Sequence, residues 1–285
     1  MPGVSFAIRF ENLEGNPKVN LFEAITSDER YLTDIEAAHA QIDIRRLTKN
    51  GVENVEVPID KEAIRAQGEV TPFLMEGCRR GTGNLVLLAR LNNRVVARCS
   101  VRLDLHPIEY FYDVYQVGST GEKWSSEVDM IAAQPVSSGY KPKTGEKFLL
   151  VHGWNMQDWE KRSWIATTFK RLWWQGYQGS VALFDWPTLY DFDSFWDVAT
   201  DLRHFDNSEF RAWLSSDALA AKFAILNADG QLRVLAHSMG NVVTASALRK
   251  YTGQPVHTYI ATQAALSAQF FDSSVAQTAN CAAFS

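Results

Sequence analysis

The residues best suited to catalytic chemistry lie in the run Ala236-His237-Ser238-Met239-Gly240. The apolar residues before Ser238 predict a buried strand, and the residues after it predict a helix. A serine becomes an effective nucleophile when a sharp strand-to-helix turn exposes it, and that turn needs small residues two positions to either side. Ala236 and Gly240 meet this requirement, although Ala236 stands where a glycine is usual. We therefore predict that Ser238 is a catalytic nucleophile.

A second run, His152-Gly153-Trp154, ends another predicted strand, over residues 147–152. Sites of this kind bind an oxyanion with the backbone N–H of the residue after the nucleophile and with an N–H from the loop after an earlier strand. The sequence therefore predicts Met239 and Trp154 as oxyanion donors, with His152 and Gly153 supporting the loop. The two runs occur in the order that such a site requires, which is more specific than either run alone.

Three blocks of the chain resemble a bacterial family of largely uncharacterised α/β-hydrolases related to lipases and esterases. The blocks are residues 151–155 (VHGWN), 184–188 (FDWPT) and 236–241 (AHSMGN). The resemblance covers about residues 148–271 and implies an α/β-hydrolase fold with Ser238 as nucleophile, without implying a substrate. Trp154 stands where the family usually has Phe, and Thr188 where Ser is usual.

The acid and the histidine that would activate Ser238 are harder to place. In this fold both follow the serine in chain order, and the residues after Ser238 include one Asp, Asp272, and one His, His257. His257 begins the predicted strand 256–261, which puts it roughly 15–20 Å from the serine edge of a parallel sheet. Asp272 is a candidate acid, with a loop or cap residue as the alternative. The main expectation is a sheet that is incomplete at its C-terminal end, without the strands that carry the acid and the histidine.

Several other features have both a functional and a structural interpretation. His204 follows the second strand of the α/β pattern and could lean over the site, whereas His237 is expected to pack within its strand. The glycine-rich run 77–83 lacks the Gly-Lys-Ser/Thr ending of a phosphate loop and predicts a turn. Five aspartates between positions 191 and 206 could bind Ca²⁺, but they lack EF-hand spacing, and helix capping is the alternative. Most tryptophans are expected to pack in the core, with Trp154 and Trp196 as candidate walls of a substrate pocket.

The elements predict two domains. Residues 1–117 contain short strands with period-two patterns, including a hairpin in which Asn92-Asn93 joins two β-rich runs, and they predict a mainly antiparallel, sandwich-like domain. Residues 118–146 are rich in Ser, Thr, Gly, Pro and Lys and predict a linker. Residues 147–285 alternate predicted strands (147–152, 180–184, 232–236 and 256–261) with helices (158–176, 217–227 and 241–250), which predicts an α/β fold with a parallel sheet.

Composition excludes some classes of protein and favours others. The 285 residues are 46% hydrophobic and carry a formal net charge of -5, with no basic stripe for nucleic acid. No apolar run approaches the roughly 18 residues of a membrane span, and residues 1–10 lack the layout of a secretory signal. The three scattered cysteines mildly favour the cytoplasm, and the dispersed histidines predict neither a metal site nor another cofactor.

The expected function is that of a serine hydrolase acting on a small-molecule carboxylic ester or other acyl substrate. The alternative is a non-catalytic, hydrolase-like module whose β domain binds a partner or a polymer. Extending the sequence past Ser285 would discriminate between them, because the enzyme requires an Asp and a His in the strands that follow.

Overall fold

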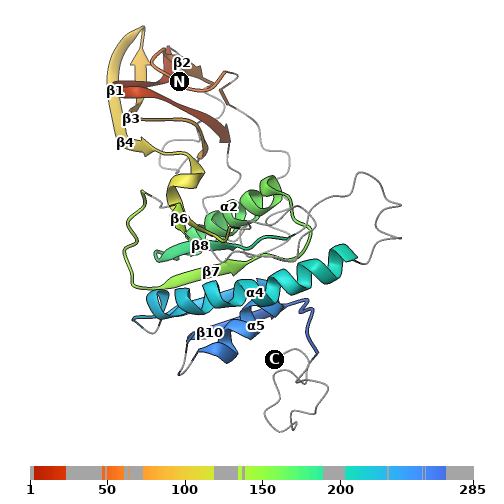
Figure 1. Ribbon diagram of the computed structural model, residues 1–285. Helices are drawn as coiled ribbons and strands as arrows, with labels where there is room; N and C mark the ends of the chain where they lie inside the picture. Colours follow the sequence, from red (N-terminus) through yellow and green to blue (C-terminus); the bar gives the residue numbers. More distant parts are fainter. Residues whose placement is uncertain are drawn as a thin grey trace, which may run out of the picture. The chain divides into compact units, whose positions relative to one another are not determined.

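The chain divides into two units, Met1–Ile108 and Glu109–Ser285, in a computed structural model (Figure 1). The structure describes residues 3–23, 47–48, 50–60, 64, 73–118, 134–136, 139–188, 203–229, 231–251, 253 and 255–267. The division lies ahead of the boundary predicted at residue 117. We call Met1–Ile108 the β unit and Glu109–Ser285 the α/β unit.

The β unit contains an antiparallel sheet with strand order β2-β1-β3-β4. Its strands are β1 (Val4–Glu23), β2 (Val57–Ile59), β3 (Phe73–Leu91) and β4 (Arg94–Leu105). The predicted hairpin is confirmed, because Asn92 and Asn93 join β3 to β4 with φ angles of 49° and 65°. Asparagine tolerates this left-handed region, which a tight two-residue hairpin turn requires at both positions. The described residues of this unit form a single sheet, so the second layer of the predicted sandwich is not among them.

The strands β1 and β3 pair along nearly their whole length, from Val4 opposite Leu91 to Glu23 opposite Phe73. Three register irregularities interrupt the pairing between Glu11 and Val19, and β-bulges of this kind bend and twist a sheet. The glycine-rich run 77–83 lies inside β3, so the predicted turn there is wrong. Gly81 explains the glycines of this run in part, since a Cβ at Gly81 would lie 2.8 Å from the backbone N of Pro17.

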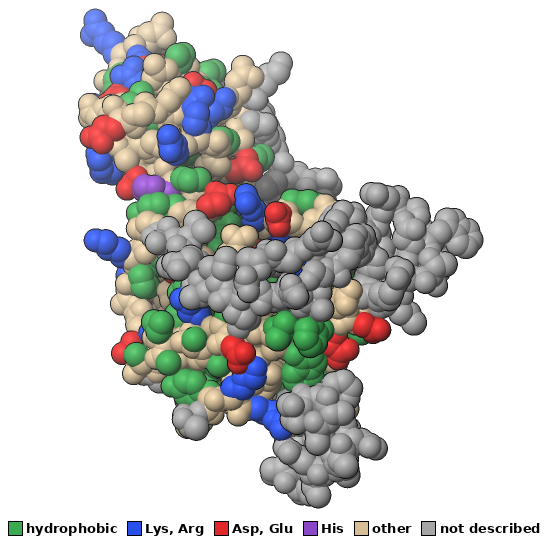
Figure 2. Space-filling view, viewed as in Figure 1, with side chains coloured by type: hydrophobic (Ala, Val, Ile, Leu, Met, Phe, Trp, Pro, Cys, Tyr) green, Lys and Arg blue, Asp and Glu red, His purple; other side chains and the backbone are tan. Residues whose placement is uncertain are grey.

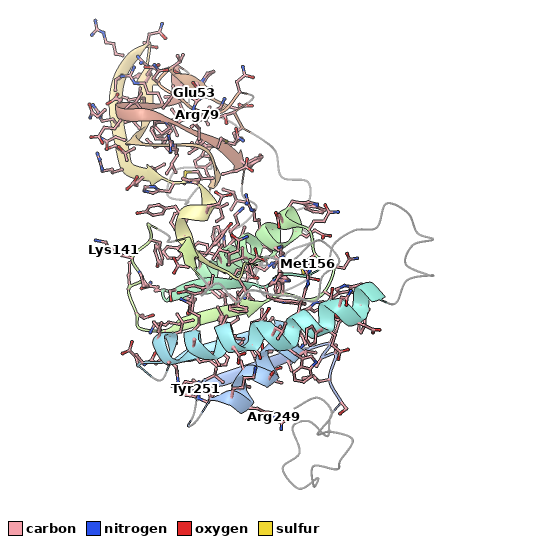
Figure 3. All side chains as sticks on the ribbon, viewed as in Figure 1. Glu53, Arg79, Lys141, Met156, Arg249 and Tyr251 are labelled. Carbon is pink, nitrogen blue, oxygen red and sulfur yellow. The ribbon has the colours of Figure 1, made fainter. Side chains whose placement is uncertain are left out.

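One apolar cluster forms the core of the β unit. Its buried members come from all of the sheet except β4 and from the neighbouring segment around Val52: Ile8, Phe10, Val19, Leu21, Val52, Ile59 and Leu85. Charged side chains of both signs are interspersed on the visible surface of this unit (Figure 2). Many of them pair; Glu53, for example, lies 3.0 Å from Lys18 and 3.2 Å from Arg79 (Figure 3). On the visible face, neither sign of charge dominates among the described residues.

The α/β unit contains a six-stranded sheet with strand order β10-β9-β7-β8-β5-β6. The five parallel strands are β5 (Asp113–Gln116), β7 (Lys147–Val151), β8 (Ser180–Asp185), β9 (Leu232–His237) and β10 (Thr258–Thr262), and β6 (Gln134–Val136) pairs antiparallel with β5. This confirms the predicted α/β class and parallel sheet. The strands β5 and β6 lie in the segments predicted as the end of the β domain and the linker, yet they extend this sheet.

Three helices within the described residues cover the sheet: α2 (Asp158–Trp174), α4 (Arg203–Leu226) and α5 (Gly240–Lys250). Helices α4 and α5 pack on one another and share one apolar core with the strands, through residues such as Leu219, Phe223 and Val243. Right-handed crossovers place α2 on the opposite face, since β7 to β8 and β8 to β9 run in opposite directions across the sheet (Figure 1). A 3-10 turn, η3 (Ile108–Phe111), precedes β5. Among the described helices, none is long and apolar enough to cross a membrane.

The order of strands reverses at β7, because β8 lies on one side of it and β9 on the other. In open parallel sheets the crevice outside the carboxyl ends of the strands at such a reversal is the usual place for a ligand. The carboxyl end of β7 leads into His152-Gly153-Trp154, and that of β9 leads into Ser238. The fold therefore brings the two predicted site runs to one edge of the sheet.

Candidate active site

Ser238 occupies a sharp turn between the end of β9 and the start of α5. Its φ angle is 50°, a left-handed conformation that costs a residue with a Cβ about 1–3 kcal/mol. Hydrogen bonds hold its peptide groups in place: the backbone N of Ser238 donates to the carbonyl oxygen of Thr262 (3.0 Å), and the backbone N of Ala265 donates to that of Ser238 (3.2 Å). Thr262 is the last residue of β10 and Ala265 lies just after it, so the neighbouring strand stabilises the turn.

Asn241 is the main anchor of this turn, and sequence reasoning assigned it no role. Its backbone N and its side-chain Nδ2 both donate to the carbonyl oxygen of Ser238, at 3.0 and 2.9 Å. The hydroxyl of Tyr259 in turn donates to Oδ1 of Asn241 (2.7 Å). Burial raises the pKa of Tyr259 far above its ordinary value, so the hydroxyl keeps the proton that it donates. The one signal for Asn241 was its place at the end of the AHSMGN block.

Two glycines allow the loop after β7 to touch the serine turn. A Cβ on Gly240 would lie 2.5 Å from the carbonyl oxygens of both Val151 and His152. A Cβ on Gly153 would lie 3.1 Å from the Cβ of Ser238. The predicted requirement for a small residue two positions after the serine therefore has a physical cause, which is the close approach of β7.

The predicted oxyanion donors flank this contact. Met239 follows the serine and is buried, and Trp154 follows Gly153. The Trp154 ring packs edge-to-face on Phe205, with ring centroids 5.2 Å apart, so the first turn of α4 lies beside the predicted oxyanion loop. His204 precedes Phe205 in that turn. The structure thus brings Ser238, Met239, Gly153 and Trp154 together.

A buried polar network lies behind the predicted oxyanion loop. His152 is fully buried, with Nδ1 at 2.8 Å from the carbonyl oxygen of Gly153 and Nε2 at 3.1 Å from Oδ1 of Asp185. Lys161 of α2 donates to the same carboxylate oxygen (2.7 Å). The Trp186 ring stacks on His152, and its Nε1 donates to the His152 carbonyl oxygen (2.7 Å). The network ties the loop to β8 and α2, and neither Lys161 nor Asp185 was recognised from the sequence.

The surroundings of Asp185 keep its carboxyl group ionised. Burial by itself raises the pKa of this carboxyl, but the hydrogen bond with His152 and the charges of His152 and Lys161 outweigh burial. The net result is a pKa below the ordinary value, so Asp185 stays ionised at neutral pH. A cavity of about 440 Å³ opens beside this network, lined in part by Met156, Lys161 and Thr188. Figure 3 labels Met156.

Neither His237 nor His257 contacts Ser238 through any described side-chain bond. His237 Nε2 lies 2.7 Å from Oε1 of Gln263, and its ring packs near Trp164. His257 directly precedes β10, whose opposite end, Thr262, pairs with His237. This confirms that His257 lies far from the serine edge.

Some predicted residues lie outside the described part of the chain. They are Asp272, Trp196 and the aspartates at 191, 193, 197 and 201. Within the described ranges, no group of three or more His, Cys, Asp or Glu side chains is placed to hold a metal ion.

Comparisons with models of protein families, with curated proteins and with solved structures find no match for this chain. The case for a function therefore rests on the geometry of the residues themselves.

Proposed function

We propose that the chain is a serine hydrolase of the α/β-hydrolase type, related to esterases and lipases, that acts on a carboxylic ester or other acyl substrate. One observation carries the proposal. Ser238 has a left-handed backbone at a strand-to-helix turn, and Gly153 approaches its Cβ closely. That geometry exposes a serine at the carboxyl edge of a parallel sheet, next to a loop able to supply a second oxyanion donor.

In the proposed reaction the Ser238 hydroxyl attacks the substrate carbonyl and forms an acyl-enzyme, releasing the alcohol. The backbone N–H groups of Met239 and Trp154 bind the oxyanion of the tetrahedral intermediate. A histidine takes the serine proton and returns it to the leaving alcohol, and water then hydrolyses the acyl-enzyme in the same way. The described residues do not include this histidine or its acid partner.

A second candidate is a non-catalytic module with the same fold, whose β unit binds a partner or a polymer. It is favoured by the contacts of His237 and the position of His257, because neither of these two histidines is placed to activate Ser238.

The two candidates are separated by labelling the complete, folded protein with a fluorophosphonate probe, which reacts with activated serines. The hydrolase predicts labelling that is lost in Ser238→Ala and kept in Ser163→Ala, since Ser163 is an exposed serine on α2. Lack of labelling at Ser238 in a folded protein would exclude the hydrolase and support the binding module. A screen of esters with increasing acyl length would then identify the substrate class.

A further inference from the structure

The outward face of helix α2 combines exposed tryptophans with exposed cations. Eight residues between positions 159 and 174 are exposed. Two of them carry a hydroxyl group, and the other six are Trp159, Trp173, Trp174, Arg162, Lys170 and Arg171. Tryptophan has a large apolar ring, which usually packs in a core or an interface. The composition of this face is therefore that of a contact surface.

The three exposed tryptophans lie on one side of the helix. Trp173 and Trp174 follow Trp159 by 14 and 15 residues, which is about four turns at 3.6 residues per turn. They therefore share a face with Trp159 and lie about 21 Å from it along the helix axis. The exposed fractions of Trp159, Trp173 and Trp174 are 63%, 42% and 51%. The Trp173 ring also packs on Tyr140 and Phe169, which fixes that end of the face.

The charge of this face is positive, although the whole chain has a formal net charge of -5. Between positions 159 and 174 every exposed charged side chain is Lys or Arg. The one acid in this range, Glu160, is half-buried, and its carboxylate accepts a hydrogen bond from the backbone N of Gln157. In the part of the chain that the structure describes, no carboxylate forms an ion pair with Lys170 or Arg171. These two cations are therefore open to an external anionic partner.

A lipid surface fits this face better than a protein or a nucleic acid does. All of the apolar side chains exposed on the face are tryptophans, and tryptophan concentrates where lipid headgroups meet acyl chains. Lys and Arg beside such rings bind anionic headgroups. Protein interfaces are instead depleted in Lys and have an apolar core. Single-stranded nucleic acid binds along a positively charged groove, whereas the exposed face of a helix is convex.

We propose that α2 binds the surface of an anionic lipid bilayer and lies in the plane of that surface. Its exposed tryptophans insert among the headgroups, and its exposed Lys and Arg side chains bind the lipid phosphates. Trp159 also lines the cavity beside the His152 network, so the proposed surface begins at that cavity. The proposal is independent of the chemistry proposed for Ser238.

Vesicle sedimentation with the full chain tests the role of charge. We expect binding to vesicles of phosphatidylglycerol mixed with phosphatidylcholine, and this binding should weaken as the salt concentration rises. One Lys or Arg near an anionic surface strengthens binding about fivefold. The variant K170Q/R171Q should therefore bind these vesicles about 25-fold more weakly than the wild type does. Both variant and wild type should bind pure phosphatidylcholine vesicles weakly and alike.

The role of the rings is tested by W159A/W174A, which leaves the packed Trp173 in place. Losing two partly inserted rings should weaken vesicle binding about tenfold. The matched control is F210A/I225A, because Phe210 and Ile225 are exposed (47% and 65%) on α4, on the opposite face of the sheet. This control should bind as the wild type does. Ser238→Ala should also bind unchanged, which separates this surface from the proposed catalysis.

Circular dichroism establishes that each variant is folded before its binding is compared. A folded wild type that does not bind anionic vesicles would overturn the proposal. Equal weakening by the α2 and α4 variants would overturn it too, because binding would then not involve one particular face. So would tight binding of a single-stranded oligonucleotide that the α2 variants abolish, with no binding of vesicles.

Discussion

Ser238 combines an unfavourable backbone conformation with several hydrogen bonds to its peptide groups. The left-handed region costs about 1–3 kcal/mol for a serine. Each hydrogen bond contributes about 0.5–1.5 kcal/mol net, so the bonds to Thr262, Ala265 and Asn241 together offset this cost. A strained conformation of this kind persists only where many surrounding contacts fix it. Such positions are commonly functional sites.

Asp185 links the predicted oxyanion loop to α2, because its carboxylate bonds with both His152 and Lys161. Asp185→Asn leaves the buried Lys161 ammonium without its main counter-ion and is expected to lower the free energy of unfolding by about 3 kcal/mol at neutral pH. This is the lower end of the usual range, because Asp158 also lies 3.0 Å from Lys161. Urea unfolding measures the change. The matched control is Asp158→Asn, an exposed partner of Lys161 worth less than about 1 kcal/mol.

The difference in unfolding free energy between the wild type and Asp185→Asn should depend on pH in a definite direction. The folded pKa of Asp185 lies below the unfolded value of about 3.9, so its stabilisation is fully present above that value. It is lost as the pH falls from about 3.9 through the lower folded pKa. The free energies of wild type and Asp185→Asn should therefore converge in this window. A difference that stays constant on acidification would show that the Asp185 charge is not what stabilises the loop.

At the scale of elements, the contact between the end of β7 and the start of α5 is the tightest in the candidate site. Gly240→Ala places a methyl group against two backbone carbonyl oxygens, which cannot move independently of β7. We expect it to lower the free energy of unfolding by about 1–3 kcal/mol and to reduce labelling of Ser238 in the folded protein.

The control for this substitution is Gly145→Ala, because the nearest atom to a Cβ at Gly145 is 3.9 Å away. Its effect should stay within about 0.5 kcal/mol. An equally mild effect of Gly240→Ala would mean that the turn tolerates separation from β7.

Helix α4 shows why element boundaries are hard to predict. Its buried stripe of Ser208, Ala212, Ser215 and Leu219 has helical spacing, but small and polar residues fill most of it. Ser216 beside this stripe bonds to Ser246 and Lys250 of α5, so small residues serve a close contact between the helices. A pattern based on large apolar residues therefore detects only the second half of the helix, as the predicted range 217–227 did.

At the scale of the molecule, each unit has its own apolar core. Calorimetry is therefore expected to resolve two unfolding transitions. Phe10→Ala should lower one of them and Leu149→Ala the other, each by removing a buried side chain worth about 2–5 kcal/mol. Only the transition that Leu149→Ala lowers should coincide with unfolding of the turn at Ser238. A single transition shifted by both variants would contradict independent cores.

The sequence by itself determined the strand-turn-helix at Ser238, the position of His152-Gly153-Trp154 at the end of a strand, the parallel sheet and the Asn92-Asn93 hairpin. These features are local: a strand buried on both faces is a continuous apolar run, and a sharp turn needs particular small residues. Only the tertiary structure decided that Asn241 and Tyr259 anchor the turn, that Lys161 and Asp185 fix the loop, and that β5 and β6 join the second sheet. Each of these depends on residues far apart in the chain, whose charges and hydrogen bonds meet only after the strands have been ordered.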